Sequence, residues 1–199
     1  MAVILSKLRY NFVKKAGGMA VAIFGGSFDP PHAGHVAVVK RALQTLPVDR
    51  LYVVPAFVNP FKEGTHAPAE LRLQWLRRIF ENEARVEVSD FEVCQERPVP
   101  TVETVRHFRQ RDPSVYLIIG SDNLDALARW HDFERLDSMV TWVVATRRGH
   151  HAGGMLRTLD VDVDVSSTEL RALEKTHLIP DAVRAEIENY YKELQCKNG

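Results

Sequence analysis

Residues 25–35 read GGSFDPPHAGH, a constrained turn that ends in two histidines, His32 and His35, three positions apart. Glycines let a backbone approach a ligand closely and adopt positive φ angles, whereas prolines fix the path of the chain. A helix that begins near Gly34 would point its positive end at this turn and place both imidazoles on one side. Main-chain amides and two imidazoles that face an anion suit charge stabilisation in phosphoryl or nucleotidyl transfer.

Two other interpretations of this stretch stay open from local sequence. One is a tight turn between a strand and a helix whose imidazoles lie at the surface. The other is half of a metal site, because histidines three apart can chelate. A metal site needs at least a third ligand, and Asp29 is the carboxylate near in sequence. The local features favour a phosphate site over both.

A second polar cluster, SSTELR at residues 166–171, places three hydroxyls at the start of a predicted helix. Ser166 or Ser167 would serve as an ordinary N-cap, and Glu169 would complete a capping box with Ser166. Arg171, one turn further on, has no role in such a cap. An arginine that projects beside hydroxyls and main-chain amides is suited to holding a polyphosphate.

The elements that must position these clusters alternate between strands and helices. Apolar runs predict strands at 20–24, 51–56, 115–120, 141–146 and 161–165, and alternation predicts a half-exposed strand at 85–93. Helices are predicted at 34–46, 69–82, 101–111, 121–130, 166–175 and 180–194. In the second helix, Leu71, Trp75 and Ile79 form one apolar stripe. Ser121 or Asp122 would cap the fourth.

This alternation predicts an α/β fold of the Rossmann-like, doubly wound type. We expect a mostly parallel sheet with helices on both faces and a small helical extension at the C-terminus. Such sheets bind ligands at the carboxyl ends of their strands. Loops 25–34, 120–123 and 166–171 follow predicted strands. We therefore expect the imidazoles and the late hydroxyls to converge on one triphosphate.

Composition excludes several other classes of function. The chain has 199 residues, enough for one domain with a sizeable core, and 26 basic residues balance 26 acidic ones. This balance provides no electrostatic footprint for nucleic acid or an anionic membrane surface, and no apolar run is long enough to span a bilayer. Cys94 and Cys196 lie far apart, which fits a reducing cytoplasm better than a disulfide framework. A homo-oligomer remains open.

We divide the chain at Met19 into an extension, residues 1–18, and a single domain, residues 19–199. In the extension the apolar residues precede the basic ones, the reverse of a secretory signal. It is either a short amphipathic arm that packs on the domain or a partner, or an annotation artefact upstream of a true start at Met19.

Together the two polar clusters resemble the motifs of the nucleotidyltransferase superfamily that carries HxGH near its N-terminus and (I/V)SSTxxR near its C-terminus. The first motif is matched by His32, Gly34 and His35, and the second by Val165, Ser166, Ser167, Thr168 and Arg171. Within that superfamily the chain is most similar to the bacterial nicotinate-nucleotide adenylyltransferases, from about Met19 to Lys192.

Four further segments carry this resemblance. The family's GADNL…W segment is GSDNLDALARW at 120–130, and its LIPxxVxxYI-like tail is LIPDAVRAEIENYY at 178–191. Its YTxxTL segment is PTVETV, with Pro100 in place of the aromatic residue, and its PxxxxPHK loop is PAFVNPFK, with Phe61 in place of histidine. The last two departures concern recognition of the acceptor substrate rather than the chemistry.

The resemblance implies transfer of the adenylyl group of ATP to nicotinate mononucleotide in NAD biosynthesis, with Mg²⁺ held mainly by the ATP phosphates. The implied catalytic residues are His32, His35, Lys62 and Arg171. The implied ATP contacts are Gly25, Gly26, Ser27, Phe28, His32, His35, Asp122, Ser167, Thr168 and Arg171. The implied contacts of nicotinate mononucleotide are Lys62, Thr101 and Trp130. Trp130 is equally well explained as a core aromatic, and Asp122 as a helix cap.

Rival functions stay open at this point. One is an adenylyltransferase for nicotinamide mononucleotide or phosphopantetheine, and another is a non-catalytic nucleotide-sensing module on the same fold. The residues by themselves do not distinguish the acid from the amide substrate, because main-chain amides that bind a carboxylate leave no residue signature.

Overall fold

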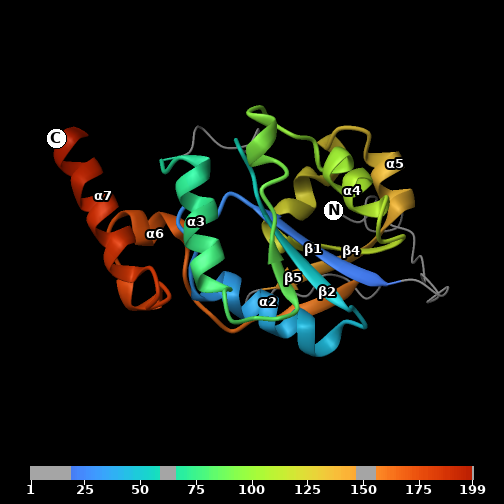
Figure 1. The fold of residues 1–199 in the computed structure, drawn as a ribbon, viewed down its shortest axis with the longest axis horizontal. Coiled ribbons are helices and arrows are strands. Elements are labelled where there is room, and N and C mark those ends of the chain that lie inside the picture. The colour runs from blue at the N-terminus through green and yellow to red at the C-terminus, as the bar shows by residue number, and fades with distance from the viewer. Residues whose placement is uncertain (1–18, 59–65, 147–155, 199) are drawn as a thin grey trace.

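The structure, a computed structural model, describes residues 19–58, 66–146 and 156–198. These residues form a parallel sheet with the strand order β3-β2-β1-β4-β5-β6 (Figure 1). The strands are β1 (Ala20–Gly26), β2 (Arg50–Pro55), β3 (Val86–Val88), β4 (Ser114–Gly120), β5 (Val140–Thr146) and β6 (Arg157–Asp160). The chain winds outward in both directions from the neighbouring strands β1 and β4. The predicted Rossmann-like architecture is confirmed.

Helices cover both faces of the sheet. The α-helices are α2 (Ala33–Thr45), α3 (Ala69–Ile79), α4 (Thr101–Arg109), α5 (Phe133–Met139), α6 (Ser167–Arg171) and α7 (Arg184–Asn198), and the 3₁₀ helices are η1 (Val93–Gln95), η2 (Ser121–Arg129) and η3 (Thr176–Leu178). Residues of α2 and α3 share one apolar core with one face of the strands, and those of α4, α5 and η2 share another with the opposite face. Since both faces are buried, the central strands are continuous apolar runs.

The C-terminal helices α6 and α7 pack on the outer side of α3, to the left in Figure 1. Their core includes the fully buried Trp75 of α3, with Leu71 and Ile79 packed against it. The indole Nε1 of Trp75 donates to Glu186 of α7 at 3.0 Å. The predicted stripe on α3 thus exists, and it binds the C-terminal extension.

Two predicted strands are wrong in position or length. Residues 161–165 are not a strand: the last strand is β6, and the ladder ends where the Val161 amide donates to the Thr146 carbonyl at 3.0 Å. Beyond this bond, Val161 and Val165 are buried, whereas Asp162 and Asp164 are exposed. The alternation of apolar and acidic residues therefore reflects burial of one side of an extended segment that leads to α6, not pairing in the sheet. The strand predicted at 85–93 shrinks to β3, because the chain turns after Val88 and enters η1.

Three helix predictions also change. The helix predicted at 121–130 is the 3₁₀ helix η2, and its N-cap is Gly120 rather than Ser121 or Asp122. The helix predicted at 166–175 ends at Arg171, before two residues with left-handed φ angles. The last helix begins at Arg184, four residues after Pro180, because a turn whose Val183 amide donates to the Pro180 carbonyl precedes it.

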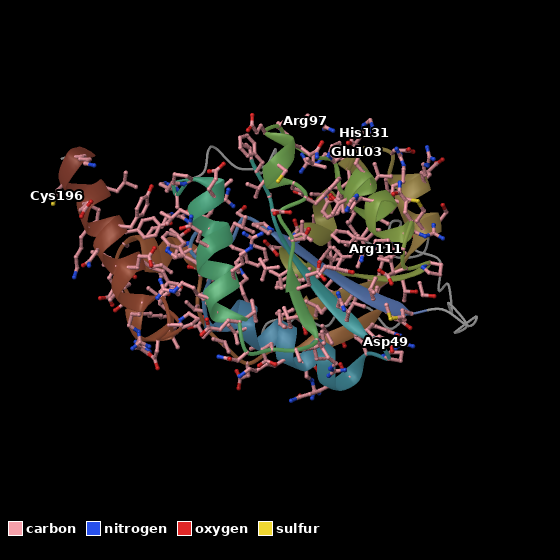
Figure 2. The ribbon with its side chains drawn as sticks, in the orientation of Figure 1. Asp49, Arg97, Glu103, Arg111, His131 and Cys196 are labelled. Atoms are coloured by element: carbon pink, nitrogen blue, oxygen red, sulfur yellow. The ribbon has the colours of Figure 1, made fainter. Side chains whose placement is uncertain are left out.

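Several expectations concern residues outside the described ranges. They include the extension at 1–18, the division at Met19, and Lys62 and Phe61 of the loop after β2. Within the described ranges, no helix is both long and apolar enough to cross a membrane. Cys94 and Cys196 are exposed free thiols on η1 and α7 (Cys196 is labelled in Figure 2).

Candidate active site

The loop between β1 and α2 carries the glycine- and histidine-rich stretch, and its left-handed residue is not a glycine. Gly25 and Gly26 have no positive φ, so that expectation was wrong; Phe28 has a φ of 50° instead. A Cβ on Gly26 would lie 3.2 Å from the ring of Phe28. The buried Phe28 ring in turn lies edge-on to His35, with centroids 4.8 Å apart. The absence of a side chain at Gly26 leaves room for the Phe28 ring, which packs against the ring of His35.

The two histidines lie together at the start of α2. Their rings are stacked, with centroids 3.7 Å apart and 23° between planes, so the prediction that they face the same side is confirmed. The main-chain N–H of His32 donates to Nδ1 of His35 at 3.1 Å. Since Nδ1 accepts this bond, a neutral His35 carries its proton on Nε2, where it can donate to a ligand.

Gly34 explains the spacing of the histidine motif. A Cβ at Gly34 would lie 3.0 Å from Nδ1 of His32 and 3.4 Å from a methyl group of Val165. A side chain here would therefore push the imidazole ring away from the late segment. The same contact shows that the residue before the SST hydroxyls already lies beside the histidines.

The late cluster begins with the predicted capping box. Ser166 is the N-cap of α6; its hydroxyl accepts from the Glu169 amide at 3.2 Å, and its own amide donates to Glu169 Oε2 at 2.8 Å. Hydrogen bonds from Lys175 and Ser166 lower the pKa of Glu169 to about 2. Glu169 is thus charged at neutral pH and engaged in the cap, and the cap does not use Ser167, Thr168 or Arg171.

Those remaining residues connect the two clusters. The Ser167 hydroxyl donates to the Pro30 carbonyl at 3.1 Å, across 137 positions of sequence. Arg171 donates from Nη1 to the Asp29 carbonyl at 2.7 Å and from Nη2 to the Thr168 hydroxyl at 3.0 Å. The hydroxyls and the guanidinium of the late segment therefore lie against the loop that holds the imidazoles, as the sequence predicts.

The buried side chain of Asp29 accepts hydrogen bonds from two other segments of the chain. Its Oδ1 accepts from the Tyr191 hydroxyl at 2.6 Å and the Ala67 amide at 3.0 Å, and its Oδ2 accepts from the His66 amide at 2.8 Å. Burial alone would raise the pKa of Asp29, but these hydrogen bonds, with Tyr191 foremost, leave it lowered. The carboxylate of Asp29 is therefore an anion that accepts hydrogen bonds from Tyr191 of the C-terminal helix and from the amides of Ala67 and His66. These bonds occupy the carboxylate that the sequence offered as a third ligand to the two histidines. Within the described ranges no three His, Cys, Asp or Glu side chains form a metal-binding group.

Arg72 of α3 is a residue of the site that the sequence reasoning missed. It is fully buried, and its guanidinium donates to the carbonyls of Ser27 (2.5 Å), Ala56 (2.8 Å), Phe57 (3.0 Å) and Ala67 (3.0 Å). Burial lowers the pKa of Arg72, and the charge of Asp29 acts against that shift. Arg72 lies three residues before Trp75 and four before Leu76, so helical spacing places it on the apolar face of α3. An arginine on an apolar face was the sequence signal that could have identified this residue.

The remaining predicted residues lie at the ends of other elements. Thr101 is the first residue of α4, Asp122 is an exposed residue of η2, and Trp130 follows η2. The partly buried Trp130 packs against the second core and lies edge-on to Trp142, with centroids 6.3 Å apart. In a parallel sheet the N-terminus of α4 and the start of η2 share the carboxyl edge with the β1 loop.

Charged residues surround the start of α4. Arg97 and Glu103 form an ion pair at 2.6 Å, and Figure 2 labels both beside His131. Arg97 lowers the pKa of Glu103, with smaller effects from Arg106 and His131. His131 follows Trp130, and Glu103 lies two residues after Thr101.

A cavity of about 500 Å³ adjoins the phosphate-binding candidates. Its polar lining includes His66, Thr168, Arg171 and Gln195, and Tyr191 and Leu194 of α7 close its outer side. The guanidinium of Arg171 thus lies between the histidine loop and a space bounded by the C-terminal helix.

Comparisons with known proteins agree with this arrangement. The family described as Cytidylyltransferase-like matches residues 23–173. Curated relatives named "Probable nicotinate-nucleotide adenylyltransferase" include one from Sulfurimonas denitrificans, 45% identical over 177 residues that cover 89% of this chain and 97% of that protein. Another, from Nitratiruptor sp., is 46% identical over 176 residues, 87% of this chain and 99% of that protein.

Among solved structures, the fold resembles that of Plasmodium falciparum nicotinic acid mononucleotide adenylyltransferase complexed with NaAD. The TM-score is 0.65 at 19% identity, over 88% of this chain and 96% of that one. At this identity the likeness concerns the fold, whereas the curated relatives match in sequence over nearly their whole length. The chain belongs to the nicotinate-nucleotide adenylyltransferase family, within the wider cytidylyltransferase-like group.

Proposed function

We propose that this protein transfers the adenylyl group of ATP to nicotinate mononucleotide, giving nicotinate adenine dinucleotide and pyrophosphate. The observation that carries the proposal is the contact of Ser167 and Arg171 with the main chain of the histidine loop. It brings two imidazoles, two hydroxyls and a guanidinium to one edge of the sheet. This set of groups stabilises the charge of a polyphosphate during nucleotidyl transfer.

The reaction needs no side-chain nucleophile. A phosphate oxygen of nicotinate mononucleotide, already anionic, attacks the α-phosphorus of ATP while the bond to the bridging oxygen of the β-phosphate breaks. Pyrophosphate leaves with that electron pair. Catalysis rests on alignment of the two substrates and on neutralisation of the charge that gathers on the α-phosphate and the leaving group.

Each group of the early and late clusters has a role in this scheme. Nε2–H of His35 donates to an α-phosphate oxygen, and the stacked His32 fixes the ring and adds a second donor toward the phosphates. Ser167, Thr168 and Arg171 hold the β- and γ-phosphates. The main chain of Gly25, Gly26, Ser27 and Phe28 borders the nucleotide, and Asp122 binds the ribose.

The acceptor binds at the start of α4 and the end of η2. There Thr101 and Trp130 contact the nicotinate ring, and Lys62, from the loop after β2, reaches the phosphates. The names of the relatives at 45–46% identity favour nicotinate over nicotinamide mononucleotide or phosphopantetheine as the acceptor. We propose a cytoplasmic location, where these substrates are made and used.

Magnesium enters this scheme with its substrate. The groups that face the phosphates are cationic or neutral, and the buried carboxylate of the loop, Asp29, is engaged by Tyr191, His66 and Ala67. Such a donor set suits MgATP, whose phosphate oxygens and water hold the ion, rather than a resident metal.

The test is pyrophosphate release by the purified protein with MgATP and each of three acceptors: nicotinate mononucleotide, nicotinamide mononucleotide and phosphopantetheine. We expect the highest kcat/KM with nicotinate mononucleotide. A higher value with either of the others would replace the proposed acceptor. Tight binding of ATP without pyrophosphate release from any acceptor would identify a nucleotide-sensing protein instead.

A further inference from the structure

The C-terminal helix α7 sends one hydroxyl into the candidate site. The Tyr191 side chain is 1% exposed, and its hydroxyl donates to Asp29 Oδ1 at 2.6 Å. Burial and the neighbouring Asp29 raise the pKa of Tyr191, so the phenol stays protonated and remains a donor at any physiological pH. A neutral donor to a buried carboxylate makes a strong, charge-assisted hydrogen bond.

The same aspartate holds the phosphate-binding arginine by its main chain. The Asp29 carbonyl accepts from Nη1 of Arg171 at 2.7 Å, while the Thr168 hydroxyl accepts from Nη2 at 3.0 Å. These two bonds fix the plane of the guanidinium. The side chain of Asp29 is anchored by Tyr191 and by the amides of His66 and Ala67, so the position of its carbonyl depends on those donors.

We propose that Tyr191 is a positioning residue of the transfer reaction: from the C-terminal helix it holds Asp29, whose carbonyl aims the guanidinium of Arg171 at the phosphates. The inference rests on the proposed function and assigns a catalytic purpose to the C-terminal extension. Without the hydroxyl, Asp29 keeps its charge but loses a fixed partner, and Arg171 loses the alignment that counts most as charge develops on the leaving group.

The adjacent tyrosine offers a matched control. The Tyr190 hydroxyl also leaves α7, but it donates at 2.7 Å to the His66 carbonyl rather than to Asp29. The rings of Tyr190 and Tyr191 both pack against Trp75. Replacement of either tyrosine by phenylalanine removes one hydroxyl from the same helix and retains this ring contact. The two variants differ in whether the lost bond reaches Asp29.

The experiment measures steady-state pyrophosphate release and, separately, the affinity for MgATP by calorimetry without an acceptor. For Tyr191→Phe we expect a kcat about tenfold lower, a Kd for MgATP about threefold higher, and a KM for nicotinate mononucleotide within twofold of wild type. For Tyr190→Phe we expect all three values within twofold. Circular dichroism and thermal denaturation confirm that both variants are folded.

A double-mutant cycle tests whether Tyr191 acts through Arg171. In an Arg171→Ala background we expect Tyr191→Phe to change kcat and Kd by less than twofold, because the group that it positions is gone. A further tenfold loss of kcat there, an equal loss in Tyr190→Phe, or unchanged kcat and Kd in Tyr191→Phe would each overturn the proposal. If the wild type releases no pyrophosphate with any acceptor, the proposed function fails. The MgATP affinities of the wild type, Tyr191→Phe, Arg171→Ala and the double variant still decide the role of Tyr191.

Discussion

The two halves of the candidate site are built differently. On the proposed phosphate side, α6 bonds the Pro30 and Asp29 carbonyls of the β1 loop. Two buried side chains anchor this loop: Asp29 accepts from the Ala67 amide, and Arg72 donates to the Ser27 carbonyl. On the proposed acceptor side, Thr101 is the first residue of α4 and Trp130 follows η2. Glu103, two residues after Thr101, pairs with Arg97 at the surface.

This difference matches the division of labour in the proposed reaction. Adenylyl transfer needs a rigid cradle for the polyphosphate, and contacts across more than 130 positions of sequence make one. Recognition of an acceptor ring needs side chains that can change independently. The departures at Pro100 and Phe61 fall in segments that the family resemblance assigns to the acceptor. The phosphate side keeps the HxGH and SSTxxR motifs, and its one departure is Ser27 in place of the family's threonine.

The largest effect is expected at Arg72, which links the β1 loop of the phosphate side to the segment after β2. Its guanidinium bonds the Ser27 carbonyl of the phosphate side and the Ala56 and Phe57 carbonyls at the end of β2. Arg72→Met leaves four buried or partly buried carbonyls without their donor, which we expect to lower the free energy of unfolding by about 3–5 kcal/mol. Urea denaturation measures it.

Arg77→Met is the control for that prediction. Arg77 lies on the same helix but is half exposed and pairs with Asp90 at the surface, so its loss should change stability by less than about 0.5 kcal/mol. Equal stability of the two variants would show that the carbonyl clamp contributes nothing.

The next effect tests the phosphate side alone. We expect His35→Ala to lower kcat about 10²-fold or more while the protein stays folded, because the Nε2 donor to the α-phosphate is lost. His35→Asn retains an acceptor near Nδ1 for the His32 amide and removes Nε2, so it should lose as much activity with less loss of stability. Turnover by pyrophosphate release and thermal melting are the measurements. A folded variant with wild-type turnover would remove the role of that ring.

A third prediction concerns the support of the acceptor side. Glu92 is buried under α4, and the Thr104 hydroxyl donates to its Oε1 at 2.6 Å. Burial raises the pKa of Glu92 from 4.5 to about 7, although the bond from Thr104 lowers it. The folded protein therefore binds more protons than the unfolded chain between these values, and the contribution of Glu92 to stability declines as pH rises through 7.

The size of that decline follows from the shift, about 3 kcal/mol between pH 4.5 and pH 8. Glu92→Gln cannot ionise, so the stability of the variant relative to wild type should rise over this interval. Urea denaturation of both proteins at several pH values measures the difference. A constant difference across the interval would contradict the raised pKa.

The smallest effect tests the acceptor side at its ring contact. We expect Trp130→Ala to raise KM for nicotinate mononucleotide about tenfold while KM for ATP stays within twofold, because a stacking surface is lost on one substrate only. Trp130→Phe should retain most of the affinity. Parallel changes in both KM values would mean that Trp130 acts as a core aromatic beside Trp142.

Much of the fold could be predicted because its strands are buried on both faces. The runs at β1, β2, β4 and β5 are apolar throughout, and their alternation with helices leaves few alternatives to a parallel sheet. The failures occur where one-sided burial resembles a strand, as at 161–165, and where a short polar helix follows a strand, as in η2. At 161–165 the local pattern cannot report whether a neighbouring strand exists, and at η2 it cannot distinguish a 3₁₀ helix from an α-helix.

The sequence by itself determined the chemical inventory of this protein: two histidines at a helix start, hydroxyls with an arginine at another, and the order of strands and helices between them. These are short-range properties, set by residue type and spacing along one element. Only the tertiary structure decided which hydrogen-bond partner each buried polar side chain has. Asp29, Arg72 and Tyr191 are far apart in sequence, and a charged or phenolic residue on an apolar face has no visible partner until the chain is folded. Burial makes such partners obligatory, since an unpaired charge in the interior is too costly, so the packing of α3 and α7 against the β1 loop selected them.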